Sequence, residues 1–188
     1  GRTVGGGVMD PVRYQPPVEE FLEKVAHRCR EAGGVFILDE VTSGWRFGFP
    51  GAMSALGLDP DIAVYAKAIS NGFPCAAIVG REEVMDAANP SFISSTYWTE
   101  SVGPVAALAT LEALAQSDVP AHIHSIGEMT RQGLTELAAR HALPLKAARY
   151  PCLTTPHFDC EPRAQCFTLV TISMLHRASV CGSDVYPL

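Results

Sequence analysis

The chain has 188 residues, of which 47% are hydrophobic and 18% charged, enough to bury one good core and a small second one. A formal net charge of −6, with no block of basic residues, argues against a nucleic-acid surface and favours small metabolites as partners. No apolar run is long enough to span a bilayer and no signal peptide is found, so no membrane association is expected. The six cysteines lie at irregular spacings and are interpreted as reduced thiols in the cytoplasm.

The N-terminal region predicts a β-α-β arrangement. Residues 1–13 are typical of a strand that ends in a loop, and a helix is expected after Pro16, with Pro17 in its first turn. The apolar face of this helix consists of Phe21, Leu22, Val25, Ala26 and Cys29, and the helix ends at Gly33 and Gly34. The apolar run 35–38 then predicts a strand buried on both faces of a parallel sheet, reached by a right-handed crossover.

The middle of the chain predicts further short elements. A long loop rich in glycine and aromatic residues, 44–51, follows the strand, and long loops in compact units are more often functional than idle. A helical turn near residues 52–56 and a second apolar strand, 62–66, come next. Another β-type run, 73–80, and a short helix, 82–88, follow.

The rest of the chain predicts two longer helices and a small α+β domain. The first helix has Pro104 in its first turn and continues to about Ser117. The second begins at Pro120 and ends near His141; its expected buried residues are Ile123, Ile126, Met129, Leu134 and Leu137. Strands are expected at 145–148 and 152–158, a helix at about 162–177, and a last run at 185–187.

Two charged residues stand where the first two apolar strands after the N-terminal helix end. Asp39 directly follows the run 35–38, and Lys67 follows the run 62–66. The carboxyl ends of strands in open α/β sheets meet at one edge, where ligands bind. Pyridoxal 5'-phosphate (PLP) needs a lysine at one end and an acidic partner for its ring nitrogen at the other. The sequence therefore suggests a PLP site at this edge.

The residues around Asp39 and Lys67 also resemble a family signature. The segments FILDEVTSGWR, at 36–46, and PDIAVYAKAISNG, at 60–72, are similar to the signature of the class III (ω-type) aminotransferases. That family includes glutamate-1-semialdehyde aminomutase. The similarity continues through residues 73–81 and 99–106 and extends over nearly the whole chain.

The resemblance implies an α/β fold, the PLP-dependent transferase fold type I, with a mixed, mostly parallel sheet in a partial large domain. Residues 1–118 would form the C-terminal half of the large PLP-binding domain, and residues 119–188 an incomplete small α+β C-terminal domain. Full members of the family extend further at both ends, so the chain is interpreted as a fragment. Members are homodimers with active sites at the subunit interface, and a homodimer is therefore expected of the complete chain.

The resemblance also implies a reaction, which is amino-group transfer between small amino and carbonyl substrates. Intramolecular amino exchange, the isomerase reaction of the aminomutase, is the other form of this chemistry. Two alternatives stay open. The same residues could serve a PLP-dependent decarboxylase or racemase, because the protein selects which bond at Cα is broken. The chain could instead be a catalytically inactive fragment or a non-catalytic homologue.

Lys67 and Asp39 are the predicted catalytic residues. Lys67 is one of three lysines and follows an apolar run, where a solvated lysine is unexpected. The resemblance implies that Lys67 forms the Schiff base with PLP and moves a proton during catalysis; from spacing alone, a surface lysine is an equal alternative. Asp39 matches the aspartate that pairs with the ring nitrogen, and its alternative is an acid that caps a loop.

Val41 and Thr99 are predicted to contact the cofactor. Val41 matches a position that packs on the ring, with an ordinary core valine as the alternative. Thr99 matches a threonine that reaches the cofactor phosphate of a neighbouring subunit, where amides at the start of a helix complete an anion site. A helix N-cap is the alternative for Thr99. Glu40 is expected either to support the loop or to lie solvated at the edge, without a catalytic role.

Four residues are candidates for the substrate entrance: Trp45, Arg46, Tyr97 and Trp98. Arg46 could receive a carboxylate, and for each of the four, packing or loop anchoring is the alternative. No metal site is predicted. His122 and His124 are two residues apart on a predicted helix and do not share a face, and the cysteines lack the paired spacing of zinc ligands.

Overall fold

The computed structural model describes residues 5–12, 17–18, 20–148 and 150–177. The chain divides into two compact units, Gly1–Val119 and Pro120–Leu188, and each is described by itself. The last run expected at 185–187 lies outside the described residues.

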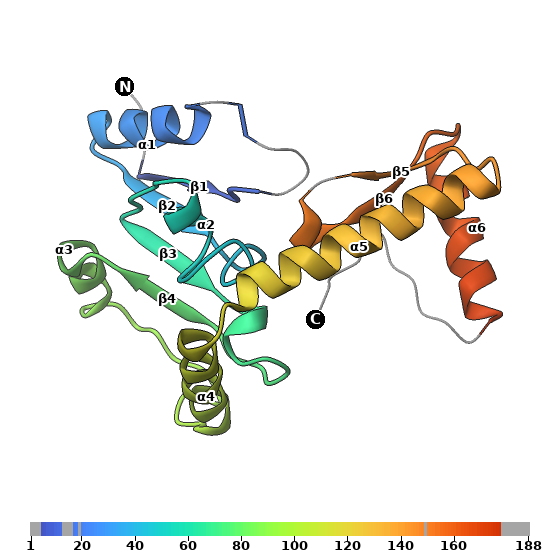
Figure 1. Ribbon diagram of the computed structural model, residues 1–188. Helices are drawn as coiled ribbons and strands as arrows, with labels where there is room; N and C mark the ends of the chain where they lie inside the picture. The colour runs from blue at the N-terminus through green and yellow to red at the C-terminus, as the bar shows by residue number, and fades with distance from the viewer. Residues whose placement is uncertain (1–4, 13–16, 19, 149, 178–188) are drawn as a thin grey trace. The chain divides into compact units, whose positions relative to one another are not determined.

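Unit 1 is built on a four-stranded sheet with the strand order β1-β2-β3-β4 (Figure 1). The strands are β1 (Gly6–Met9), β2 (Val35–Asp39), β3 (Ile62–Tyr65) and β4 (Ala77–Gly80). The pairs β1 with β2 and β2 with β3 are parallel, and β3 with β4 is antiparallel. The expected mixed, mostly parallel sheet is therefore confirmed. Residues 73–76, expected within the last run, lie outside β4.

The described helices cover one face of this sheet. Helix α1 (Phe21–Glu31) buries Leu22 and Ala26 against Phe36 and Leu38 of β2. Helix α4 (Val102–Gln116) packs through Ala107 into a second cluster that contains residues of β3. In-register neighbours on paired strands share a face, and Leu38 pairs with Ala63 of that second cluster. Both clusters therefore lie on the same side of the sheet.

The other face is only partly covered, which corrects the expectation that strand 35–38 is buried on both sides. Phe36 and Leu38 are fully buried, but the alternating residues of β2 are only half-buried. On the same face as those residues, Val8 of β1 is 63% exposed and Ile78 of β4 is 60% exposed. All residues of the run 35–38 are apolar, yet buried and half-buried residues alternate along it, because the described helices pack on one side of the sheet.

Shorter elements of unit 1 agree with the pattern except at the start of α1. Helix α2 (Ala52–Ala55), helix α3 (Glu82–Met85) and the 3-10 turn η2 (Asp86–Ala88) lie where short helices are expected. Helix α1 begins at Phe21 and not at Pro17, after Glu20 in a left-handed conformation. Phe21, expected on the buried face, is 45% exposed.

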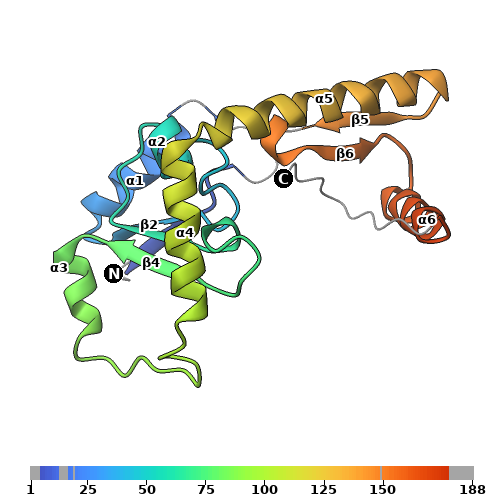
Figure 2. The same ribbon diagram turned by 60° about the horizontal axis from the view of Figure 1, so that its bottom comes forward.

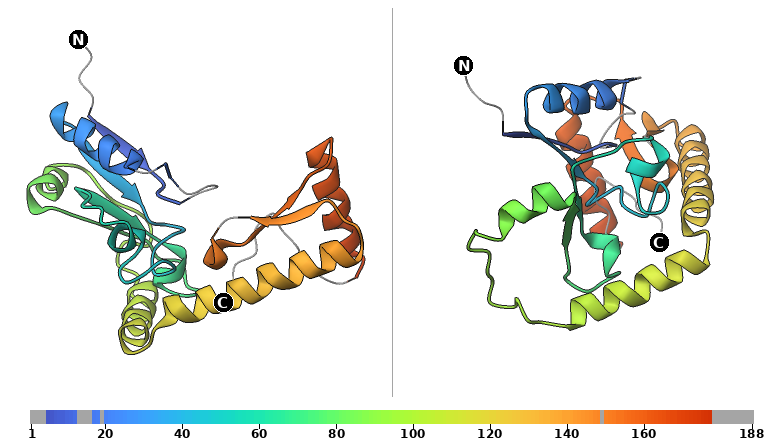
Figure 3. Two further views of the ribbon diagram at one scale, coloured as in Figure 1. Left: turned by 45° about the horizontal axis from the view of Figure 1, so that its top comes forward. Right: turned by 90° about the vertical axis from the view of Figure 1, so that its left-hand side faces the viewer.

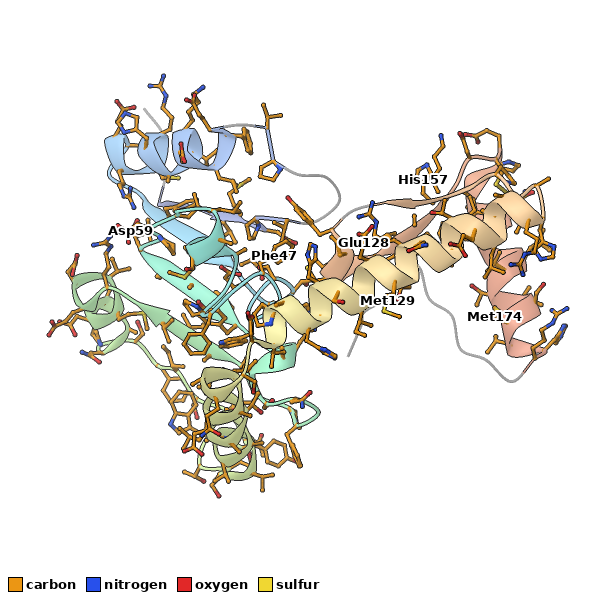
Figure 4. All side chains as sticks on the ribbon, in the orientation of Figure 1. Phe47, Asp59, Glu128, Met129, His157 and Met174 are labelled. Carbon is orange, nitrogen blue, oxygen red and sulfur yellow. A yellow bond between two sulfur atoms is a disulfide. The ribbon has the colours of Figure 1, made fainter. Side chains whose placement is uncertain are left out.

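Charged side chains tie the strands together at the end where β3 begins. Asp61 accepts a hydrogen bond from the backbone amide of Phe36 at 2.8 Å and faces Arg81 Nε at 3.2 Å. Arg30 and Arg81 both contact Asp59. Asp59 lies at this end of the sheet and Phe47 lies in the loops at the other end (Figure 4).

Unit 2 packs one long helix beside a two-stranded antiparallel sheet (Figure 3). Its elements are α5 (Val119–Arg140), β5 (Leu145–Ala148), the 3-10 turn η3 (Pro151–Leu153), β6 (Thr155–Phe158) and α6 (Arg163–Leu175). The small α+β arrangement is as predicted, but the buried face of α5 is so only in part. Ile123, Ile126 and Leu134 are half-buried, whereas Met129 and Leu137 are exposed. Gly127 is buried because it lets the turn 151–153 approach the helix backbone, and Ala138 is buried as well.

The cysteines correct a second expectation. Cys160 and Cys166 form a disulfide, while Cys29 and Cys75 remain thiols. The six-residue spacing carried no recognisable signal, because the turn between β6 and α6 brings the two sulfur atoms together. These two cysteines therefore do not support the expectation of reduced thiols in the cytoplasm. Among the described helices, none combines the length and apolar character that crossing a membrane requires.

Candidate active site

The carboxyl ends of β2 and β3 form one edge of the sheet. Asp39 is the last residue of β2 and pairs in register with Val64 of β3. The amide of Glu40 continues the ladder by donating to the carbonyl of Val64 at 2.9 Å. Lys67 follows β3 directly after Ala66 and opens the 3-10 turn η1 (Lys67–Ile69). The parallel pairing thus brings the two loops that contain Asp39 and Lys67 to the same edge.

Asp39 keeps part of its carboxylate available. It is half-buried, and its Oδ1 accepts a hydrogen bond from the backbone amide of Val41 at 3.0 Å. Among the described residues, Oδ2 has no hydrogen-bond partner. This local contact is the loop-capping role considered for Asp39, and it leaves one oxygen for a ligand. Val41 is half-buried beside it.

Lys67 reaches from its own loop to the loop after β2. Its Nζ donates a hydrogen bond to Thr42 Oγ1 at 2.7 Å. The residue is exposed, which corrects the expectation that a lysine after this apolar run is shielded from solvent. Lys67 lies beyond the last residue of β3, where the sheet no longer covers the side chain.

Backbone strain gathers in the same two loops. Trp45, Lys67 and Asn71 have φ values of 59°, 53° and 43°, in the left-handed region that side chains other than glycine rarely adopt. Such conformations cost about 1–3 kcal/mol each, and they cluster at functional sites. Three of the five described non-glycine residues with positive φ lie at this edge, the others being Glu20 and Ala142. The strain marks this edge of the sheet as the functional one.

The loop after β2 is folded around a buried carboxylate. Glu40 is fully buried, and it accepts hydrogen bonds from the amides of Ala52 at 3.0 Å and Met53 at 2.6 Å, and from the Ser43 hydroxyl. Gly51 makes room for it, since a Cβ there would come within 2.8 Å of the Glu40 carboxyl carbon. The supporting role expected for Glu40 is therefore the one observed, and the solvated alternative is wrong.

Two aromatic rings pack behind this loop. Trp45 is 5% exposed and lies against Tyr65, with ring centroids 4.7 Å apart. Its Nε1 has no hydrogen-bond partner among the described residues. Burial and the nearby negative charge of Glu40 raise the pKa of Tyr65 to about 12. Trp45 thus has the packing role that was the alternative to substrate contact.

The other three entrance candidates differ in their surroundings. Arg46 Nη1 donates to the carbonyl of Thr42 at 2.6 Å, an anchoring contact within the loop. Tyr97 and Trp98 are 78% and 65% exposed. They belong to the turn 96–99, in the loop that leads to α4 (Figure 2).

The start of α4 does not offer the anion site expected near Thr99. The amides of Val102 and Gly103 donate to the Glu100 carboxylate, at 3.1 Å for Gly103. A carboxylate already occupies these donors and would repel a phosphate. Ser101 is the N-cap residue, so Thr99 is not a helix cap either; its side chain is exposed.

The side chains at this edge fit PLP at the ring and at the reactive carbon. An aspartate with an unused oxygen and a lysine amine are the donor set for the ring nitrogen and the aldehyde. The described residues contain no group of three or more His, Cys, Asp and Glu side chains that could hold a metal ion. Thr42 was missed by sequence reasoning. Only its position, three residues after Asp39, could have drawn attention to it.

Comparisons with known proteins point to one family. The model of the family described as aminotransferase class-III matches residues 10–149. A 2'-deamino-2'-hydroxyneamine transaminase from Streptomyces kanamyceticus is 35% identical over 80% of this chain and 38% of its own length. A glutamate-1-semialdehyde 2,1-aminomutase from Nitrosomonas europaea is 40% identical over 76% of the chain and 34% of its length. The 4-aminobutyrate aminotransferase of Escherichia coli is 37% identical over 71% and 33%.

Solved structures show the same fold. The FumI protein of a Sphingopyxis species superposes with a TM-score of 0.87 and 23% identity, covering 96% of this chain and 45% of that protein. A transaminase solved with PLP bound gives a TM-score of 0.84 and 25% identity, with 96% and 46% covered. The chain therefore has the PLP-dependent transferase fold, and it spans less than half the length of these relatives.

Proposed function

Because this chain belongs to the class-III aminotransferases, we propose that it supplies the lysine-bearing part of a PLP-dependent enzyme of amino-group transfer. The observation that carries the proposal is the parallel pairing of β2 and β3, which brings Asp39 and Lys67 to one edge. The relatives include transaminases and an aminomutase. Their names support small amino and carbonyl compounds as substrates, with transfer between molecules or within one molecule.

Each residue at the edge has a proposed task. Asp39 would hold a proton at the ring nitrogen through its unused oxygen. Lys67 Nζ would hold the cofactor covalently until the substrate amine replaces it, and the released amine would then move a proton at the substrate Cα. When bound, PLP supplies the electron-withdrawing ring that makes loss of the Cα proton possible. Val41 packs against the cofactor ring. Thr99 contributes its hydroxyl to the cofactor phosphate, without the amides at the start of α4. Arg46, Tyr97 and Trp98 are kept as candidates for substrate contact.

The proposal also covers the whole protein. Residues 1–118 would be the C-terminal half of the large domain and residues 119–188 part of the small domain, in line with a match to less than half of each relative. Exposed apolar side chains on α4, Val102, Val105 and Leu108, support a homodimer of the complete protein. A cytoplasmic location is retained as part of the proposal.

The test is covalent capture of the cofactor. The 188-residue chain is mixed with PLP, reduced with borohydride, digested and analysed by mass spectrometry. The pyridoxyl group should lie mostly on Lys67, with Lys24 and Lys146, both exposed, as references within the same molecule. Lys67→Arg, which keeps the positive charge, should abolish this preferential labelling and leave only the label on Lys24 and Lys146. Equal labelling of the three lysines would instead favour an inactive homologue.

A product assay separates the remaining chemistries once capture succeeds. A labelled amino acid should yield the corresponding carbonyl compound if the reaction is amino transfer. Release of labelled carbon dioxide would indicate a decarboxylase, and inversion at Cα a racemase.

A further inference from the structure

Among the described residues, Thr42 is the one hydrogen-bond partner of the Lys67 amine. The hydrogen bond from Lys67 Nζ to Thr42 Oγ1, at 2.7 Å, joins residues 25 positions apart. It also links the loop after β2 to the loop after β3, beside the packing of Trp45 and Ile69 in one cluster. The contacts that fix the position of Thr42 therefore also fix the position of the Lys67 amine.

Thr42 is held from two directions. Its carbonyl accepts a hydrogen bond from Arg46 Nη1 at 2.6 Å. The next residue, Ser43, gives its hydroxyl hydrogen to the buried Glu40 carboxylate, and its carbonyl accepts from the amide of Arg46 at 3.0 Å. Glu40 in turn accepts from two amides on the far side of the loop. A buried, fully paired carboxylate thus anchors the backbone that presents the Thr42 hydroxyl.

Lys67 is constrained from its own side as well. Its φ of 53° is a conformation that a lysine adopts only when its surroundings require it. The side chain is long and would otherwise sample many rotamers, with up to about 2 kcal/mol of entropy to lose on ordering. A fixed backbone and one fixed hydrogen bond at the tip together confine this side chain.

We propose that Thr42 is a positioning residue for Lys67, and that its Glu40-anchored hydroxyl confines the Lys67 amine at the carboxyl edge of β2. In its neutral form, an amine that donates one hydrogen to Thr42 Oγ1 keeps its lone pair, so the contact can orient the nitrogen without blocking attack on a carbonyl carbon. The meaning for catalysis rests on the proposed function, but the contact itself does not.

The test compares Thr42→Val, which keeps the shape and loses the hydroxyl, with Thr42→Ser, which keeps the hydroxyl. The first readout needs no cofactor. Selective 13C labelling of lysine gives one set of Cε signals for each of the three lysines, and relaxation reports their mobility on the picosecond to nanosecond scale. In Thr42→Val the Lys67 signals should become at least as mobile as those of Lys24 and Lys146, which pair with the exposed carboxylates of Glu20 and Asp159, and in Thr42→Ser they should stay restrained. Far-ultraviolet circular dichroism checks that both variants are folded.

The second readout is the share of pyridoxyl label on Lys67. It should fall about two- to tenfold in Thr42→Val, the range that loss of one hydrogen bond produces, and recover in Thr42→Ser. A Lys67 as mobile as the reference lysines in the unmodified chain would overturn the proposal, as would equal mobility in both variants. Restraint by Thr42 without any capture of PLP would support the contact and contradict the proposed function, so the two can fail separately.

Discussion

Single residues at this edge owe their properties to burial. Glu40 lies in the middle of its loop, and its negative charge acts on the neighbouring Tyr65. Tyr65 is 5% exposed, and its hydroxyl donates to Met53 Sδ at 3.2 Å. Burial and the carboxylate both disfavour the phenolate, and they raise the pKa of Tyr65 from 10.0 to about 12.

This shift predicts a loss of stability at alkaline pH. Since the pKa in the folded chain is higher than in the unfolded chain, Tyr65 contributes stability that is complete below pH 10 and is lost as the pH rises to about 12. Urea unfolding between pH 9 and 12 should show the unmodified chain losing on the order of 2 kcal/mol relative to Tyr65→Phe. Tyr97→Phe, at an exposed ring, is the control. Parallel curves for the unmodified chain and Tyr65→Phe would contradict the account.

Helix α5 shows how an element depends on the size of its residues. A Cβ on Gly127 would lie 1.9 Å from the carbonyl oxygen of Pro151, so helix and turn 151–153 are in backbone contact there. Thr154, buried at the end of this turn, donates its hydroxyl to the Pro151 carbonyl at 3.0 Å. Gly133, on the same helix, has open space around it.

The two glycines give a matched pair of substitutions. Gly127→Ala should lower the free energy of unfolding by at least about 2 kcal/mol, because backbone must move to admit the methyl group. Gly133→Ala should raise it by about 0.5–1 kcal/mol through helix propensity. Urea unfolding followed by circular dichroism measures both. Equal effects of the two substitutions would show that α5 and the turn are not in close contact.

At the scale of the whole molecule, the sheet of unit 1 has one open face. Val8 and Ile78 are more than half exposed there, and β4 is an edge strand. Exposed apolar surface of this kind binds hydrophobic dyes and promotes association. The chain covers 38% of the length of the transaminase relative from Streptomyces kanamyceticus.

The open face predicts a difference between two adjacent residues of β4. Ile78→Lys should reduce binding of the dye ANS, because it places a charge on the open face. It should also reduce self-association of the chain, measured by sedimentation velocity. Val79→Lys places the same charge on the opposite face of the strand, where Val79 is 49% exposed beside the helix-covered clusters, and should reduce dye binding less than Ile78→Lys does. Equal reduction by both substitutions would mean that the dye binds elsewhere.

Much of this architecture follows from local sequence. The apolar runs predict β2 and β3 with Asp39 and Lys67 at their ends, and the helical periods predict α4 and α5 within two or three residues. These features depend on neighbours a few positions apart, and the period of the side chains is enough to show them. The family signature adds the cofactor.

Tertiary structure decided the rest, because it depends on the path of the chain. Glu40 is a buried anchor only because its loop returns to place the Met53 amide beside it, and Thr42 meets Lys67 only because β2 and β3 pair in parallel. The Cys160–Cys166 disulfide depends on a turn, and the one-sided burial of β2 on where the helices pack. Contacts between residues far apart in sequence produce no periodic pattern in the sequence. The sequence by itself therefore determined which functional groups lie at the carboxyl edge of the sheet, and the tertiary structure determined the contacts that position these groups.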